Sequence, residues 1–171
     1  METWDAIRAR RNVRSFEDRP IADRDLERIL EAGWRAPSSR NGQPWDFVAV
    51  TDREHLVELS HTWRGAKHVA SSAATVALVV PMTDDPDERD WQLYDLGQAT
   101  IQMMVAAADL GIGSCHSVVD DHELARRSLD LPAGRDAVAL LALGYPADRP
   151  LRPIARPDRR PKDDVIHRER W

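Results

Sequence analysis

Three guanidinium groups lie close together near the start of the chain, at Arg10, Arg11 and Arg14. Like charges at this spacing repel one another unless an anion or several carboxylates neutralise them, and the guanidinium fork suits phosphate well. Asn12, within the cluster, adds an amide donor and acceptor. The cluster indicates an anion site, with a solvated basic surface as the alternative.

Two other segments could present hydrogen-bonding groups to a ligand. The first, Ala36 to Trp45, has loop composition and precedes an expected strand; its hydroxyl, amide and proline residues are Pro37, Ser38, Ser39, Asn41 and Gln43. The second, Leu110 to Ser117, contains two glycines that let the backbone approach a flat ligand. It is not a phosphate loop, because it follows a helix instead of opening one. Each segment alone could also be an ordinary turn.

The residues around Cys115 are not expected to form a metal site. Cys115 and His116 are followed closely by Asp120, Asp121 and His122, but the start of a solvated helix explains the last three residues better. The acidic run from Asp84 to Asp90 is interpreted as a solvated loop. The single cysteine excludes an internal disulfide framework.

Composition restricts the class of protein. A chain of 171 residues with 42% hydrophobic and 31% charged residues predicts one globular domain. The net charge of −5 argues against a general nucleic-acid binder, although the tail from Arg149 to Trp171 carries a net +4. With no long apolar run and no signal-peptide pattern, we expect a cytoplasmic protein without membrane contact.

The spacing of apolar residues predicts an α+β fold with a small sheet. Trp91 to Leu110 forms a long helix that is apolar on more than one side, so it lies either in the core or at an interface with another chain. The other expected elements are helices around 4–7, 23–30 and 56–63 and after residue 121, and strands at 45–50, 73–80 and 138–143 and shortly after residue 111.

Five motifs in order give the chain a resemblance to the flavin-dependent nitroreductase family. They are Arg10–Phe16 (R-R-S-x-R-x-F in the family), Ala36–Trp45 (A-P-S-x-x-N-x-Q-P-W), Leu110–Cys115 (L-G-x-G-S/T-C), Ala142–Pro146 (A-L-G-Y-P) and the tail motif R-K/R-P at Arg159–Pro161. The resemblance covers essentially the whole chain, so residues 1–171 are expected to form one nitroreductase-like FMN-binding domain.

The resemblance implies a small central mixed sheet flanked by helices, with the long central helix at a homodimer interface and residues 149–171 wrapping the partner subunit. FMN would bind between the subunits. Its contacts would come from Arg10, Arg11, Asn12 and Arg14, from the loop residues Pro37, Ser38, Ser39, Asn41 and Gln43 across the interface, from His116, Ser117 and Val118 at the ring, and from Arg159 and Arg160 in the tail.

The resemblance also implies the activity. NADH or NADPH would give a hydride to flavin N5 and leave, and a nitroaromatic, a quinone or a similar electron-poor acceptor would then be reduced in a ping-pong cycle without a catalytic side chain. The alternatives are a different flavin reaction (dehalogenation, heterocycle oxidation or flavin breakdown) and a flavin-binding protein of low turnover. Two departures from the family pattern are Asn12, where the family usually has serine, and the short connection from Met82 to Trp91, which predicts a more open pocket.

Overall fold

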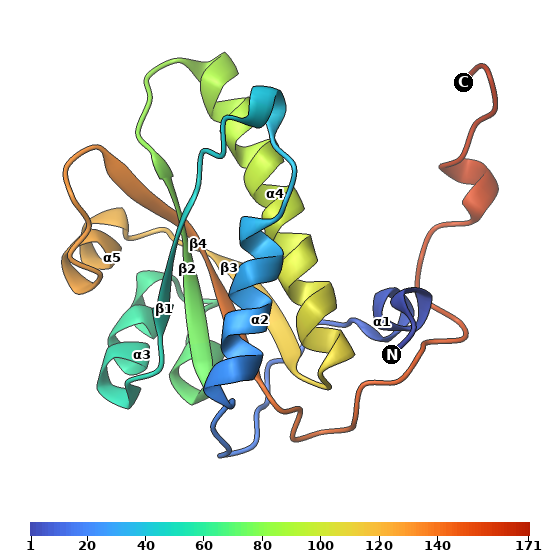
Figure 1. Ribbon diagram of the computed structural model, residues 1–171, viewed down its shortest axis with the longest axis horizontal. Helices are drawn as coiled ribbons and strands as arrows, with labels where there is room; N and C mark the ends of the chain where they lie inside the picture. Colours follow the sequence, from blue (N-terminus) through green and yellow to red (C-terminus); the bar gives the residue numbers. More distant parts are fainter.

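Four strands form one sheet in the computed structural model, which describes residues 1–171. The strands are β1 (Asp46–Val50), β2 (Ala74–Pro81), β3 (Gly113–Val118) and β4 (Arg135–Gly144), and their order across the sheet is β1-β2-β4-β3 (Figure 1). Every pairing within the sheet is antiparallel. The expectation of a mixed sheet was therefore wrong. β2 and β3 do run in the same direction, but β4 lies between them and runs the opposite way.

Helices cover both faces of the sheet. α2 (Asp23–Trp34) and α4 (Pro86–Asp109) pack on one face, whereas α3 (Arg53–Leu59) and α5 (His122–Ser128) lie on the other (Figure 1). Alternate residues of β2 serve the two cores: Leu78 faces α2 and α4, and Val79 faces the α3 side. Burial on both faces explains why β2 is an almost continuous apolar run.

α4 begins earlier than its apolar pattern predicted. The Asp85 side chain accepts hydrogen bonds from the backbone N–H groups of Asp87 and Glu88, and Pro86 occupies the first helical turn. Part of the acidic segment that was expected to be a loop is therefore the start of the helix. Only Met82 to Asp85 separate β2 from α4, so nothing inserted at this point covers the end of the sheet.

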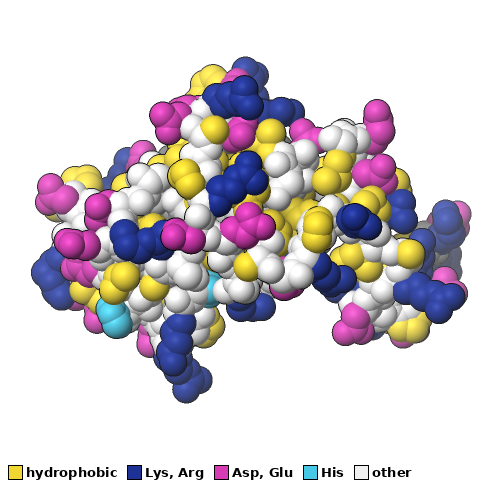
Figure 2. Space-filling view, turned by 90° about the horizontal axis from the view of Figure 1, so that it is seen from below, with side chains coloured by type: hydrophobic (Ala, Val, Ile, Leu, Met, Phe, Trp, Pro, Cys, Tyr) yellow, Lys and Arg dark blue, Asp and Glu magenta, His cyan; other side chains and the backbone are white.

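The tail leaves the body of the molecule after a short docked stretch. Leu151 is buried, and the Ile154 N–H donates to the carbonyl of Arg8. Arg8 belongs to α1 (Thr3–Ala9), so the docked stretch lies beside this helix. Beyond Ile154 every residue is exposed, and the segment from 155 to 171, called the arm below, extends past α1 and away from the sheet (Figure 1). The space-filling view shows a lobe at one side of the molecule, partly separated from the main body (Figure 2). None of the helices combines the length and apolar character that a membrane span requires.

Candidate functional site

Two apolar side chains fix the arginine-rich segment to the edge of the sheet. Val13 and Phe16 are buried, and the Val13 N–H donates to the carbonyl of Ser114 in β3 at 3.0 Å. The segment can come this close because β3 begins with a glycine. A Cβ on Gly113 would lie 2.6 Å from Val13 Cγ2. Because Val13 and Phe16 point inward, the arginines between and before them remain at the surface.

The three arginines have different partners. Arg11 donates to Asp148 Oδ1 at 2.7 Å and to the carbonyl of Arg149 at 2.8 Å, and this hydrogen bond holds the pKa of Asp148 below its usual value. Arg10 and Arg14 form no ion pair with any carboxylate. Two of the three guanidinium groups are therefore available to an added anion, whereas Arg11 joins the segment to the beginning of the tail.

The open edge of β3 presents two backbone donors. The Ser114 carbonyl accepts from Val13, outside the sheet, and the Val119 N–H donates to Val138, inside it. Because the N–H and C=O of one residue in an antiparallel strand point to the same side and this side alternates, the N–H groups of His116 and Val118 point outward from the edge. They are free to bind a ligand placed beside the strand.

A groove of about 580 Å³ runs between α4 and the strands β3 and β4. Arg10, His116 and Val118 line it together, so the structure brings these expected contacts into one place. Ser117 differs. It lies opposite Leu140, which belongs to the core on the α3 side, and its buried hydroxyl has no hydrogen-bond partner. Its N–H points toward β4, so no donor of Ser117 faces the groove.

His68 and Cys115 lie near Arg14 and are both buried. Burial is the largest effect and lowers the pKa of His68; a backbone hydrogen bond with Cys115 opposes it, and the positive charge of Arg14 lowers the pKa further by a smaller amount. Burial raises the pKa of the Cys115 thiol. A buried thiol of this kind is a poor nucleophile, which leaves the chemistry of the site to a bound group.

The loop before β1 is well ordered by its own hydrogen bonds. The Ser39 N–H donates to the buried carboxylate of Asp95 at 2.8 Å, and the Gln43 N–H donates to Ser38 Oγ at 2.9 Å. Arg40, Asn41 and Gln43 have positive φ angles, a strained conformation that is concentrated at functional sites. The loop packs over the N-terminal half of α4 (Figure 1) and lines a separate cavity of about 820 Å³, not the groove that contains Arg10.

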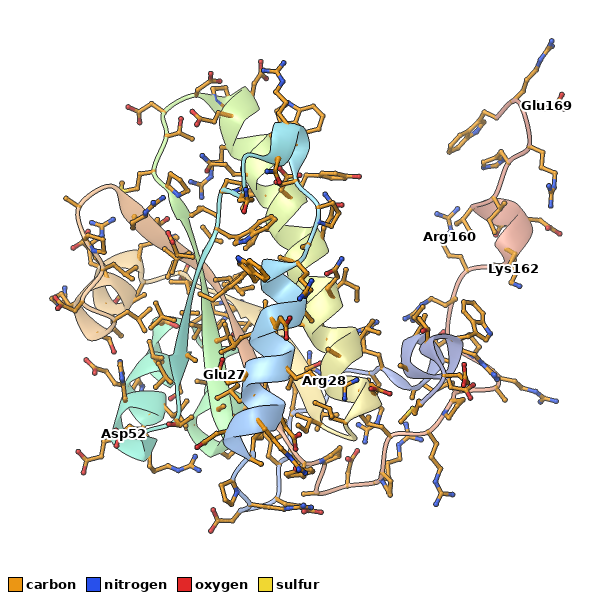
Figure 3. All side chains as sticks on the ribbon, viewed as in Figure 1. Glu27, Arg28, Asp52, Arg160, Lys162 and Glu169 are labelled. Carbon is orange, nitrogen blue, oxygen red and sulfur yellow. The ribbon has the colours of Figure 1, made fainter.

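The remaining expected contacts, Arg159 and Arg160, lie on the arm and not in the groove. Arg159 donates to the carbonyl of Asp158 and Arg160 to that of Asp164, so both guanidinium groups bind only carbonyls of the arm. Arg160 lies well away from the sheet (Figure 3). One chain therefore does not bring the loop, the groove and the arm together.

Comparisons with known proteins support the motif-based resemblance. The model of the nitroreductase family matches residues 7–67 and 58–145. A relative from Archaeoglobus fulgidus, provisionally named NADH dehydrogenase/NAD(P)H nitroreductase, is 34% identical over 96% of this chain and 96% of its own. The chain belongs to the nitroreductase family. An FMN reductase (NAD(P)H) from Bacillus subtilis is 27% identical over 94% of this chain and 71% of its own.

The fold of this nitroreductase-family protein is also that of solved relatives. A Parabacteroides distasonis structure, provisionally titled NADH dehydrogenase/NAD(P)H nitroreductase, superposes with a TM-score of 0.84 and 25% identity, covering 100% of this chain and 99% of the other. The expected family and its α+β fold are confirmed.

The groove fits the cofactor that the family resemblance implies. A phosphate needs cationic donors, and Arg10, which lines the groove, has no competing carboxylate; Arg14 also has none but is not part of the lining. The polar edge of a planar ring needs donors at a fixed spacing, and the outward N–H groups of His116 and Val118 supply them. The apolar walls include Met104 and Val138, which suit the faces of a ring.

One contact in the groove was missed from the sequence. His122 begins α5 with its side chain 40% exposed, as expected of a solvated helix start, but its Nδ1 also lies 2.9 Å from Oδ1 of Asp136, whose residue is only 7% exposed. His122 also lines the groove. An acidic residue at the start of a buried strand was the available signal, because a buried carboxylate requires a partner.

Proposed function

We propose that this protein is an FMN-dependent NAD(P)H oxidoreductase that reduces nitroaromatics, quinones or similar electron-poor acceptors. The observation that carries the proposal is that the unpaired guanidinium group of Arg10 lies along one groove with His116 and Val118, whose amides point outward from β3. The names of its relatives, an NAD(P)H nitroreductase and an FMN reductase, support the same cofactors.

Different residues of this chain would bind different parts of FMN. Arg10 and Arg14, joined by Arg159 and Arg160 of the arm, would bind the phosphate through charge-assisted hydrogen bonds, each contributing about 1.5–3 kcal/mol. Asn12, beside them, would contact the sugar-alcohol chain. The amides of His116 and Val118 would donate to the polar edge of the ring, where donors stabilise negative charge. When bound, FMN supplies hydride transfer, so no side chain needs to act as a nucleophile.

We also propose that two copies of the chain complete each site. The outer side of α4 exposes Leu93, Gly97 and Ile101 at helical spacing, and Leu93 and Ile101 are 39% and 44% exposed. A second copy packed against this surface would place its loop, with Pro37, Ser38, Ser39, Asn41 and Gln43, near the groove of the first. The arm would wrap the partner, which explains why it stands away from its own sheet (Figure 1).

The experiment is an anaerobic two-step reduction of the purified protein. The expected result is a yellow protein with one FMN per chain and about twice the mass of the 19.4 kDa chain. NADH or NADPH should bleach it, and a quinone or nitrofuran added after removal of the nucleotide should restore the colour. A flavin that neither nucleotide can reduce would refute the enzymatic proposal, and a colourless protein that takes up no FMN would refute the cofactor.

A further inference from the structure

Two arginines line the groove although the whole chain is acidic. Its lining includes Arg10, Arg89, His116 and His122 and contains no aspartate or glutamate, whereas the net charge of the chain is −5. Arg10 is assigned above to the phosphate of the cofactor. Arg89 and His122 have no assigned function.

The path of the chain places Arg89 and His122 together at the end farther from Arg10. β3 returns alongside α4, so Arg89, twenty residues before the end of α4, lies about 30 Å from that end. β3 spans six residues, about 20 Å, away from the C-terminal end of α4, and His122 begins α5 four residues after β3 ends. Arg10 instead follows α1, whose Ile7 shares a cavity with Ile101 in the C-terminal half of α4.

Each side chain keeps hydrogen-bonding capacity that the protein does not satisfy, although His122 also serves as the partner of Asp136. Arg89 is half-buried in the groove and forms no ion pair. His122 is held from behind by Asp136 through Nδ1, which leaves Nε2 without a partner in the protein. A buried carboxylate that orients a histidine in this manner is common where the other ring nitrogen binds a ligand.

We propose that Arg89 and His122 bind an anionic group of the second substrate, either a carboxylate on the acceptor or a phosphate on the reductant. This inference rests on the proposed function, because it assumes that the cofactor occupies the Arg10 end and the ring region. The apolar side chains of Leu93 and Leu96 lie between the two charged ends and suit the planar part of such a substrate. Arg89 is then a specificity-determining residue, and Asp136 is a positioning residue for His122.

The test measures dissociation constants of unreactive ligand pairs on the purified FMN-bound protein, from the change in flavin absorbance. Benzoate and benzamide have the same shape but differ in charge, and NADP⁺ differs from NAD⁺ by one phosphate. The wild-type protein should prefer the anionic member of at least one pair about tenfold or more. Arg89→Gln should reduce that preference to near unity, Arg89→Lys should retain part of it, and His122→Gln should reduce it less than Arg89→Gln.

Arg127→Gln is the matched control, because this exposed arginine on α5 carries the same charge but does not line the groove. Its preferences should equal those of the wild type. Loss of the benzoate preference in Arg89→Gln would assign the site to the acceptor, and loss of the NADP⁺ preference would assign it to the reductant. A wild-type protein without either preference, or an Arg89→Gln variant that keeps them, would overturn the inference.

Failure of the proposed function would look different. A protein that binds no FMN would still allow calorimetric titration with benzoate and benzamide, so the anion site is tested independently of the cofactor. A protein that retains FMN but does not react with nicotinamide nucleotides would refute the reaction and leave the same binding comparison intact.

Discussion

Replacing Gly113 with alanine should loosen the segment that carries Arg10 and Arg14. The added Cβ would lie 2.6 Å from Val13 Cγ2 and 2.7 Å from Val13 Cβ, well inside van der Waals contact. Val13 is β-branched and buried, with 1% of its surface exposed, so it cannot rotate away easily. Either β3 or the arginine segment must move.

The size of the effect follows from the two interactions that would be disturbed. Overpacking a well-packed core costs about 1–3 kcal/mol, and weakening the Val13 N–H to Ser114 hydrogen bond adds about 1 kcal/mol. Alanine restricts the unfolded chain more than glycine does, and this difference in entropy offsets about 0.5 kcal/mol of the loss in stability. We expect Gly113→Ala to lower the free energy of unfolding by about 1.5–3.5 kcal/mol and Tm by about 3–14 °C. FMN affinity should also fall, because the guanidinium groups would be displaced from the β3 amides.

The assay is denaturant unfolding of the apoprotein followed by fluorimetric titration with FMN. A double-mutant cycle with Val13→Gly provides the control, because the new Cβ meets the Cβ of Val13 as well as its methyl groups, and only glycine removes all three atoms. Gly113→Ala should then cost less than about 0.5 kcal/mol in the Val13→Gly background. An equal cost in both backgrounds would refute the proposed close contact, and so would a single variant as stable as the wild type.

Three other predictions concern single side chains. Arg10→Gln should weaken FMN binding about tenfold or more, whereas Arg11→Gln should weaken it less because Arg11 already binds Asp148, as equilibrium titration would show. Ile101→Asp should give a monomer in sedimentation, because a carboxylate would be buried in the proposed interface; a dimer would place the interface elsewhere. The pKa of His68 is lowered in the folded chain. As pH falls through about 6.5, the unfolded chain therefore binds a proton at this residue while the folded chain does not. The contribution of His68 to stability is present above that pH and is lost below it. The slope is at most about 1.4 kcal/mol per pH unit, and His68→Gln should remove it from unfolding curves measured between about pH 7 and 5.

The parts of the fold that depend on local pattern could be predicted from the sequence. Apolar spacing located α4, and the wholly apolar run containing Leu78 located a strand buried on both faces. Strand order could not be read in this way. β4 is the last strand in the chain but lies between β2 and β3, and no local spacing encodes that position, so spacing could not correct the mixed sheet that the resemblance implied.

The site shows the same division between local and long-range information. Arg10 and His116 meet in the groove as the motifs indicated. The pairing of Arg11 with Asp148 joins residues 137 positions apart, and that of His122 with Asp136 depends on which side chains face each other across the fold. Strand alternation could have warned that His116 and Ser117 cannot both face one ligand.

If the arm contributes to the cofactor site of a dimer, as proposed above, retention of FMN should depend on the concentration of the chain. Arg159 and Arg160 bind only carbonyls of the arm itself, while Val165 and Ile166 expose 50% and 58% of their surface. If the arm closes on a bound phosphate only when a partner supports it, subunit association and FMN binding are thermodynamically linked. Dilution would then release flavin from this protein, and excess flavin would hold the subunits together.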